Sequence, residues 1–472
     1  MLSSDEHVRN LRSMLGEKGV LVGGDTAGYE LGARFDKGLA AFVLRPASTT
    51  EVSAAVAYCV QNQIHIVAQG NNTGVVSGST PDPSGRQAVL SLDRLNRKLS
   101  IDIDNRSATV DAGYLLSQVN SALEPHGLFF PIDLGADPRL GGMLATNTGG
   151  ARFLKYGDVR KNTLGLKVVL ADAQGTIVDL SSPLRKNNTG VDWKQIFIGT
   201  CGAFGIITEC VLNLEPLPVQ TATALLVPES FEKVMPLLHL LERNFGAYLS
   251  AFEGISGSAL KGTLARIPGL RNPFSHGDLP EYVILMELNR TWLPREEEQS
   301  LDAALEAVLA EAWEAEDELL ADALIVPAQD AWALRHAIPE GVKEMGKLVA
   351  CDLSFRRGDV MKFCRHMKSE IKTRFPDVEV CEFGHIGDGG IHFNLVADPT
   401  SSLAMDPTFE SQIREWVYDE AVRFGGSFSA EHGIGRKNQI YYDKFTPAQF
   451  RQWASSLKRV TSPGGLGTVV FG

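Results

Sequence analysis

Two short histidine motifs near the C-terminus carry side chains of the kinds that bind metal ions. The first holds His385 and His392 on either side of an Asp-Gly pair, and the second holds Glu431 followed directly by His432. Two imidazoles and one carboxylate, with a coordination position left open, form a usual ligand set of a catalytic zinc ion. We therefore predict a divalent metal site made of His385, His392 and Glu431.

The spacing of the first motif predicts a β-hairpin. The Asp-Gly pair at 388–389 lies between two β-prone runs, 380–387 and 390–396, and this dipeptide favours a two-residue turn. Pairing then places His385 opposite His392. Opposite residues in an antiparallel pair point to the same face with Cβ atoms about 5 Å apart, so both imidazoles can reach one ion.

A structural role is the alternative for each of these residues. The chain has 10 histidines, and a single histidine is more often a surface or satisfied core residue than a ligand. The metal interpretation is favoured for His385 and His392, because an Asp-Gly turn that aligns two histidines is uncommon. A glutamate before a glycine-rich loop, such as Glu431, is more often solvated. Asn394, two positions beyond His392, would face the same side of the strand.

Length and composition limit the classes of protein that could carry such a site. With 472 residues, 44% of them hydrophobic, the chain can form two or three domains. No apolar run approaches the length of a membrane span, and the N-terminus lacks the features of a signal peptide. The 6 cysteines show no CxxC spacing, and the net charge is −12. We expect a soluble, cytoplasmic protein without disulfides, a membrane span or a nucleic-acid partner.

Short predicted strands and helices, interrupted by glycine clusters, occupy the first half of the chain. After an N-terminal segment, 1–37, we predict a domain over 38–218, because two prolines at 216 and 218 end its last strand. The predicted strands are 41–44, 64–68, 88–92, 108–111, 167–171 and 206–214, and the predicted helices are 50–63 and 115–124.

Strand and helix patterns alternate in a second region, 219–380, and a third region, 381–472, contains both histidine motifs. The predicted strands here are 221–227 and 281–288, and the predicted helices are 231–244, 295–315, 360–374 and 409–424. We interpret the acidic residues of the helix at 295–315 as a solvated face.

Three glycine clusters in the first domain predict a large phosphate-containing ligand. They lie at 69–78, 141–150 and 199–205, where successive backbone N–H groups can surround an anion. None fits a P-loop or a strand-linked GxGxxG motif. Each cluster alone could be a tight turn, but three in one domain favour the ligand.

The order of these motifs resembles a known family. The loop at 69–78, the segments 130–133 and 141–150, the runs 152–157 and 198–208, the histidine hairpin and the loop at 431–435 follow one another as in the FAD-linked dehydrogenases of the vanillyl-alcohol-oxidase superfamily, in the branch with D-2-hydroxyglutarate and D-lactate dehydrogenases. The resemblance spans roughly 38–460. It implies an α+β fold with a two-lobed PCMH-type FAD-binding domain, an α+β cap with an antiparallel sheet, and a C-terminal helical segment.

The resemblance also implies the residues that contact FAD. They are Gln69, Gly70, Asn71, Asn72, Thr73 and Gly74 at the pyrophosphate, Pro131, Asp133, Gly142, Ala145, Thr146, Asn147 and Gly150 at the flavin, and Gly202, Gly205 and Ile207 at the nucleotide half. Some members of the superfamily bind flavin covalently through a histidine of the first loop. This loop contains none, so we expect noncovalent FAD.

By the same resemblance, a catalytic set surrounds the metal. His385, His392 and Glu431 fall on the metal positions, with zinc expected and manganese as the alternative, and His432 falls on the catalytic base. Arg335 falls on the arginine that binds the substrate carboxylate, and Asn394 on a polar group of the substrate site. An aliphatic hydroxyl with a pKa of about 16 is far too weak an acid for a histidine of pKa about 6.5, so the ion must lower that pKa first.

The sequence departs from the hydroxyglutarate branch where a second carboxylate would bind. That branch has a threonine four positions and a lysine fifteen positions after the arginine, and this chain has Pro339 and Ala350 there. D-lactate-like substrates are therefore at least as strongly expected as D-2-hydroxyglutarate, unless Lys343 or Lys347 supplies the missing cation. The chain also has Cys201 where a glutamate is usual, and its end, 462–467, lacks the usual Asn-Pro-Gly-Lys.

We predict an FAD-dependent, metal-assisted dehydrogenase that oxidises a D-2-hydroxy acid to the 2-oxo acid, with hydride transfer to flavin N5. Its expected electron acceptor is an electron-transfer flavoprotein or a quinone, and a homodimer is compatible with the sequence. One alternative is a flavin-binding electron-relay subunit without its own dehydrogenase site, which the intact histidine and arginine set argues against. A nonredox transferase on the same fold is the other.

Overall fold

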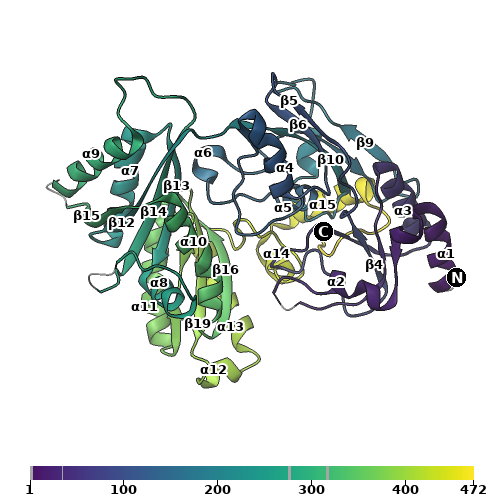
Figure 1. Cartoon of the computed structure of the whole chain (residues 1–472). Helices are drawn as coiled ribbons and strands as arrows, with labels where there is room; N and C mark the ends of the chain where they lie inside the picture. The colour runs from purple at the N-terminus through teal and green to yellow at the C-terminus, as the bar shows by residue number, and fades with distance from the viewer. Residues whose placement is uncertain (1–3, 35, 275–277, 315–317) are drawn as a thin grey trace. The chain divides into compact units, whose positions relative to one another are not determined.

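The computed structural model describes residues 4–34, 36–274, 278–314 and 318–472 and divides the chain into two compact units. Unit 1 comprises Met1–Gly149, Asp158–Leu217 and Glu431–Gly472, so both ends of the chain, purple and yellow in Figure 1, belong to it. Unit 2 comprises Gly150–Gly157 and Pro218–Ala430. Within the described residues, no helix has the length and apolar character needed to cross a membrane.

The first sheet of unit 1 has four strands in the order β1-β2-β4-β3. They are β1 (Val20–Leu21), β2 (Ala40–Leu44), β4 (Gln87–Ser91) and β3 (Ile66–Gln69). β4 is parallel to both of its neighbours, and parallel strands need a crossover. The helix α3 (Thr49–Gln61) provides it between β2 and β3, and Ser48 caps its first turn by accepting from the Glu51 backbone N–H.

The second sheet of unit 1 is antiparallel, with the order β5-β6-β10-β8-β9. Its strands are β5 (Leu99–Asp102), β6 (Ser107–Asp111), β10 (Ile206–Asn213), β8 (Thr163–Val169) and β9 (Ile177–Leu180). β10 is buried along its length except at Asn213. The two sheets share one hydrophobic core and form the two lobes of the unit.

Shorter elements complete unit 1. They are α1 (Ser4–Leu15), α2 (Ala27–Glu30), α4 (Leu116–Leu123), β7 (Leu128–Phe129), α5 (Leu140–Thr146), β11 (Glu215–Pro216), α14 (Gln439–Phe445) and α15 (Ala448–Thr461). The C-terminal segment returns to the first sheet, where Leu466 bridges Ile66 of β3 and the Gly467 N–H donates to the Ile66 carbonyl.

Unit 2 is built on one antiparallel sheet with the order β15-β12-β14-β13-β18-β19-β16, and β17 also pairs with β19. The strands are β12 (Gln220–Pro228), β13 (Leu249–Ser256), β14 (Tyr282–Arg290), β15 (Leu320–Ile325), β16 (Lys347–Ser354), β17 (Val378–Val380), β18 (Phe383–Gly384) and β19 (Gly390–Ala397). β13 and β14 are buried along their whole length. Central strands buried on both faces give rigid positions for polar side chains.

Helices cover both faces of this sheet. They are α6 (Phe153–Tyr156), α7 (Val234–Phe245), α8 (Gly257–Arg266), α9 (Leu301–Glu314), α10 (Ala328–Lys343), α11 (Val360–Arg374), α12 (Ser402–Met405) and α13 (Phe409–Arg423). α8 and α10 pack on the face that carries Ile255 and Phe383. On the other face, Phe363 of α11 contacts Phe393 of β19.

The predicted α+β fold class is confirmed, and several predicted elements agree closely with the structure. The helix predicted at 360–374 coincides with α11. The helix predicted at 409–424 corresponds to α13, which ends one residue earlier, at Arg423. β8 begins at Thr163, earlier than the predicted 167. The predicted end of the acidic helix near Ala315 lies outside the described residues.

The division of the chain differs from the predicted one at three places. One is Gly150–Gly157, which lies inside the predicted domain 38–218 but belongs to unit 2. The N-terminal segment predicted as 1–37 belongs to unit 1, and the predicted C-terminal region, 381–472, is divided after Ala430. The physical reason is strand pairing: β18 and β19 each pair with strands of the unit 2 sheet on both sides, whereas the residues after Ala430 pack with unit 1. The predicted boundary at 218 lies within one residue of the observed one.

Candidate active site

A cavity of about 280 Å³ in unit 1 is lined by all three glycine clusters. The predicted FAD contacts in its lining are Gln69, Gly70, Asn71, Asn72, Thr73, Gly74, Gly142, Ala145, Thr146, Gly202, Gly205 and Ile207. Three segments that are far apart in the sequence therefore line one cavity.

Glycines lie where two of these segments approach one another. A Cβ atom on Gly70 would lie 3.6 Å from the Gly142 backbone, so the first two clusters are in contact. A Cβ on Gly74 or on Gly142 would meet nothing within 4 Å, because both face open space. The cavity wall at these positions is bare backbone, which a large ligand can approach closely.

Four predicted FAD contacts do not line this cavity. Among the residues that the structure describes, Pro131, Asp133 and Asn147 are absent from the lining, and Gly150 belongs to unit 2. Asn147 ends α5 in the left-handed conformation with φ 53°. Its side-chain Nδ2 donates to Asp158 at 2.8 Å.

Further lining residues that were not predicted are Leu134, Gly135, Ala136, Pro138 and Arg139. Nη1 of Arg139 donates to the Gly113 carbonyl. Burial lowers the pKa of this arginine, and its Nε is buried with no hydrogen-bond partner in the described part of the chain. An arginine shortly before a glycine cluster, after the small residues Gly135 and Ala136, was the available sequence signal.

Glu431 and His432 lie in the lining of the same cavity. Their loop packs against the segment of the first glycine cluster, because the Lys437 N–H donates to the Val76 carbonyl at 3.2 Å. A Cβ on Gly433 would lie only 3.0 Å from the sulfur of Cys201. The cysteine that replaces the usual glutamate thus contacts the loop that carries the predicted base.

In unit 2, His385 and His392 lie together, with ring centroids 5.2 Å apart. The predicted register is wrong, however, because His392 pairs with Phe383 and not with His385. The turn is wider than two residues: the His385 carbonyl accepts from the N–H groups of Asp388, Gly389 and Gly390. The Asp388 carboxylate accepts from the Gly390 N–H at 2.9 Å, and this bond stabilises the wider turn.

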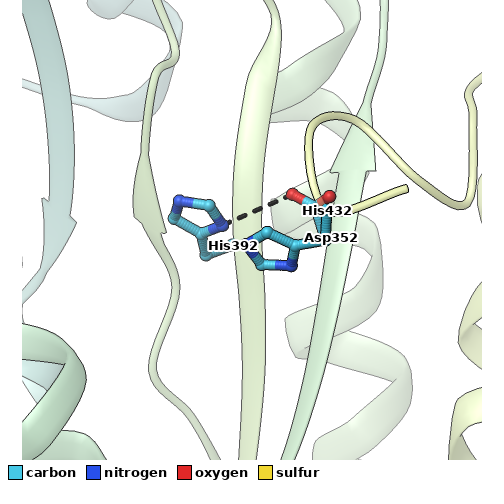
Figure 2. Close-up of side chains that lie close together, drawn as sticks. All are labelled: Asp352, His392 and His432. Atoms are coloured by element: carbon cyan, nitrogen blue, oxygen red, sulfur yellow. Dashed lines mark ion pairs between the residues drawn. The ribbon is translucent and has the colours of Figure 1, made fainter. Parts of the chain in front are cut away.

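Each of the two imidazoles faces a carboxylate through its Nδ1 atom. His385 Nδ1 lies 2.7 Å from Oε1 of Glu253 on β13, and His392 Nδ1 lies 3.4 Å from Oδ1 of Asp352 on β16. Figure 2 shows the latter ion pair between neighbouring strands, in which Asp352 is the register partner of His392. Neither carboxylate was predicted.

Asp352 also fixes the end of unit 2. Its Oδ2 accepts from the backbone N–H of Ala430 at 3.0 Å. Ala430 is the last residue of the unit, and Glu431 follows it directly in the chain. The backbone that leads to Glu431 is therefore anchored beside His392.

Arg335 projects from α10 to the same buried carboxylate that faces His385. Its Nε donates to Oε2 of Glu253 at 2.8 Å, and its Cζ lies 4.9 Å from the centre of the Phe383 ring. Burial opposes ionisation of Glu253, but the neighbouring His385 and Arg335 outweigh it and lower the pKa of Glu253 to about 2.

The two positions that depart from the hydroxyglutarate branch lie on these same elements. Pro339 is inside α10, where it cannot donate to the Arg335 carbonyl one turn earlier. Ala350 of β16 is the register partner of Asn394 on β19, so it shares a face with Asn394 and His392. Asn394 is buried, and its Nδ2 donates to the His392 carbonyl at 3.2 Å.

Two family models match consecutive parts of the chain, and the second match continues past Ala430 into unit 1. Residues 40–181 match the family described as FAD binding domain, and residues 217–466 match the family described as FAD linked oxidases, C-terminal domain. These matches define an FAD-binding oxidoreductase of the FAD-linked oxidase class.

Curated relatives show to which family within this class the chain belongs. The chain is 31% identical over 97% of its length to D-2-hydroxyglutarate dehydrogenase, mitochondrial, of Arabidopsis thaliana, of which it covers 80%. It is 30% identical over 90% of its length to D-2-hydroxyglutarate dehydrogenase of Stutzerimonas stutzeri, of which it covers 89%. The chain belongs to the family of FAD-linked D-2-hydroxyacid dehydrogenases, as the sequence predicted, and is an FAD-dependent enzyme of that family.

Solved structures of lower identity share the fold. p-Cresol methylhydroxylase aligns with a TM-score of 0.72 at 15% identity, over 98% of this chain and 95% of that one. Alkyldihydroxyacetonephosphate synthase aligns with a TM-score of 0.70 at 15% identity, over 98% and 84%. At this identity the likeness concerns architecture alone.

Proposed function

We propose that a divalent ion held by His385, His392 and Glu431 assists the oxidation of a monocarboxylic D-2-hydroxy acid to its 2-oxo acid. The observation that carries this proposal is the pair of carboxylates behind the two histidines. Because a carboxylate only accepts hydrogen bonds, Glu253 favours the proton on Nδ1 of His385. Asp352, 3.4 Å from Nδ1 of His392, acts there as a nearby negative charge. Nε2 of His385 then keeps the lone pair that a metal ion requires.

Chain connectivity supports Glu431 as the third ligand. Consecutive Cα atoms are about 3.8 Å apart across a trans peptide, and the Ala430 N–H is bonded to Asp352 beside His392. The donor set of two imidazoles and one carboxylate suits zinc, with manganese as the second choice. An ion there would lower the pKa of the substrate hydroxyl and orient the hydroxyl and carboxylate together.

The unit 1 cavity suits a noncovalent dinucleotide. Its glycine-lined walls allow backbone N–H groups to approach phosphate oxygens, and Arg139, the one arginine or lysine of the described lining, has a buried Nε that lacks a partner. The loop at 69–78 contains no histidine for covalent attachment. Bound there, FAD would accept the hydride that leaves Cα of the substrate.

His432 is the proposed base. It lines the FAD cavity and follows the proposed ligand Glu431 in the chain, so it is available to take the proton of a metal-activated hydroxyl. A histidine alone would face a difference of about nine to ten pKa units from an aliphatic hydroxyl, which is why the ion must act first.

The last part of the proposal is that the substrate has a single carboxylate. Arg335 would bind the α-carboxylate, and neither Lys343 nor Lys347 is placed to replace the two groups missing at Pro339 and Ala350. Lys343 is paired with Glu340 at 3.2 Å at the end of α10. Lys347 precedes Ala350 by three positions in β16, so its side chain points to the opposite face of the sheet. A second carboxylate buried there without a partner would cost several kcal/mol.

The proposal is tested by mixing the oxidised holoenzyme anaerobically with D- and L-2-hydroxy acids and following flavin absorbance. Rapid bleaching is expected with a monocarboxylic D-acid such as D-lactate, and much slower bleaching with its L-enantiomer. Metal analysis of the same sample should find a divalent ion. Flavin that stays oxidised with every hydroxy acid would favour a nonredox transferase, and absence of the ion would refute the metal assignment. Electron-transfer flavoprotein and a quinone are the proposed acceptors for the following step.

A further inference from the structure

One buried carboxylate of unit 2 contacts two proposed site residues at once. Glu253 lies on the central strand β13 with 1% of its side chain exposed. Its Oε1 lies 2.7 Å from His385 Nδ1, and its Oε2 lies 2.8 Å from both Nε and Nη2 of Arg335. The two oxygens thus have separate partners, one in the proposed ion site and one in the proposed substrate site.

We propose that Glu253 is a positioning residue that holds the ion-binding edge of His385 and the substrate-binding edge of Arg335 in place together. This inference rests on the proposed function, which gives His385 an ion and Arg335 a substrate carboxylate. It adds that the two binding events depend on one shared carboxylate.

The effect on His385 concerns the position of its ring proton. An ionised carboxylate can only accept hydrogen bonds. Oε1 of Glu253 therefore selects the tautomer of His385 with the proton on Nδ1 and with Nε2 unprotonated. A carboxylate behind a metal-bound imidazole also makes the ring a stronger ligand. Because the contact is buried, water does not compete with it.

The effect on Arg335 concerns the direction of its donors. A guanidinium has five N–H bonds in a fixed plane, and Glu253 engages the Nε side of that plane. The Phe383 ring lies against the guanidinium, with Cζ 4.9 Å from its centroid. Held in this way, the arginine presents its Nη1 edge in one orientation, which suits bidentate binding of a carboxylate.

A second buried glutamate separates this role from a structural one. Glu287 of β14 also has 1% of its side chain exposed. It accepts from Arg152 Nε at 2.7 Å, from Ser250 at 2.7 Å and from Trp332 Nε1 at 2.6 Å. All three partners of Glu287 donate hydrogen bonds at neutral pH. The imidazole of His385 beside Glu253 differs, because its proton can lie on either ring nitrogen. Glu287 is therefore the matched control.

The test compares Glu253→Gln with Glu287→Gln in the full-length holoenzyme. Glutamine keeps the shape but offers one acceptor oxygen in place of two. If its NH2 faces His385, the ring proton moves to Nε2 and blocks the ion; if it faces Arg335, two sets of donors oppose each other. We expect the Kd for Zn²⁺, measured by chelator competition, to rise by about 10–100-fold in Glu253→Gln, together with weaker binding of a 2-oxo acid.

Glu287→Gln should lower the Tm while leaving the Zn²⁺ affinity unchanged. Equal Zn²⁺ affinity in Glu253→Gln and the wild type would overturn the inference, and so would an equal loss in the two variants. A wild-type protein that binds no ion would instead refute the proposed function itself, so the two failures are distinguishable.

A measurement on the wild type keeps the inference testable if Glu253→Gln does not fold. In ion-free protein labelled with ¹⁵N-histidine, long-range ¹H–¹⁵N spectra report which ring nitrogen carries the proton. His385→Asn removes the signal and assigns it. We expect the proton of His385 on Nδ1 alone, and a neutral ring protonated on Nε2 would overturn the role of Glu253.

Discussion

The two units use opposite means to prepare a binding site. In unit 1 the cavity is lined by three glycine clusters, and Arg139 is the one arginine or lysine among its described lining residues. In unit 2 the site consists of ionisable side chains on buried strands, each histidine with its own carboxylate. A long cofactor can be recognised along its length by many backbone donors, whereas an ion and a small acid need a few charges in fixed positions.

This difference predicts different responses to substitution. A side chain added to the cavity of unit 1 should exclude the cofactor without altering the chemistry of unit 2. A side chain removed from the site of unit 2 should stop the reaction without releasing the cofactor. The following variants test whether the two functions separate in this way.

The largest effect is expected for His385→Ala and His392→Ala. Each removes one of two imidazole ligands, so the ion should be lost and turnover should stop while FAD remains bound. Metal content, the flavin spectrum and kcat are measured on the same preparation. His239→Ala, which removes an exposed histidine of α7, is the control. Near-normal kcat in an ion-free variant would refute the metal assignment.

His432→Asn should reduce the rate of flavin reduction by about 100-fold or more, the usual scale for a lost general base. Stopped-flow absorbance with a D-2-hydroxy acid measures this rate. The ion and FAD should both be retained, because His432 is proposed to move a proton and to bind neither. Loss of the ion from this variant would make His432 a ligand.

Gly142→Leu should weaken FAD binding by about tenfold or more, because the side chain would enter the open space in front of α5 at a cost of about 1–3 kcal/mol for overpacking against the cofactor. The Zn²⁺ affinity should not change. Gly28→Leu is the matched control, since Gly28 is exposed in α2 and also has nothing within 4 Å of its Cβ position. Equal FAD affinity in the two variants would contradict the placement of the cofactor.

The smallest effect concerns specificity. Ala350→Lys should shift kcat/KM toward D-2-hydroxyglutarate relative to D-lactate by about 1–3 kcal/mol, the worth of a hydrogen bond to a charged group. Lys347→Ala, which removes a lysine from the other face of β16, should leave the ratio unchanged. If the wild type already prefers D-2-hydroxyglutarate by more than about tenfold, equal to 1.4 kcal/mol, another cation reaches that carboxylate.

The histidine hairpin shows which features could be predicted from the local sequence and which could not. The Asp-Gly pair and the flanking β-prone runs predicted correctly that His385 and His392 lie close together. They did not predict the wider turn, because the Asp388 side chain bonds to the Gly390 N–H, nor the register, which β16 and β18 set on either side of β19. Likewise, the glycine clusters predicted the cavity. They did not predict that residues between 134 and 139 also line it, because that depends on the path of the chain in the folded unit.

The sequence by itself determined the family, the glycine clusters of the FAD unit and the two histidine motifs, since these are recorded in residue type and short spacing. Only the tertiary structure revealed that Glu253 lies beside His385, 132 positions later in the chain, and that Asp352 lies beside His392. Both contacts follow from the order of strands in the sheet of unit 2. No period or spacing in a single sequence fixes which strands become neighbours, because that order depends on how the whole sheet buries its apolar faces.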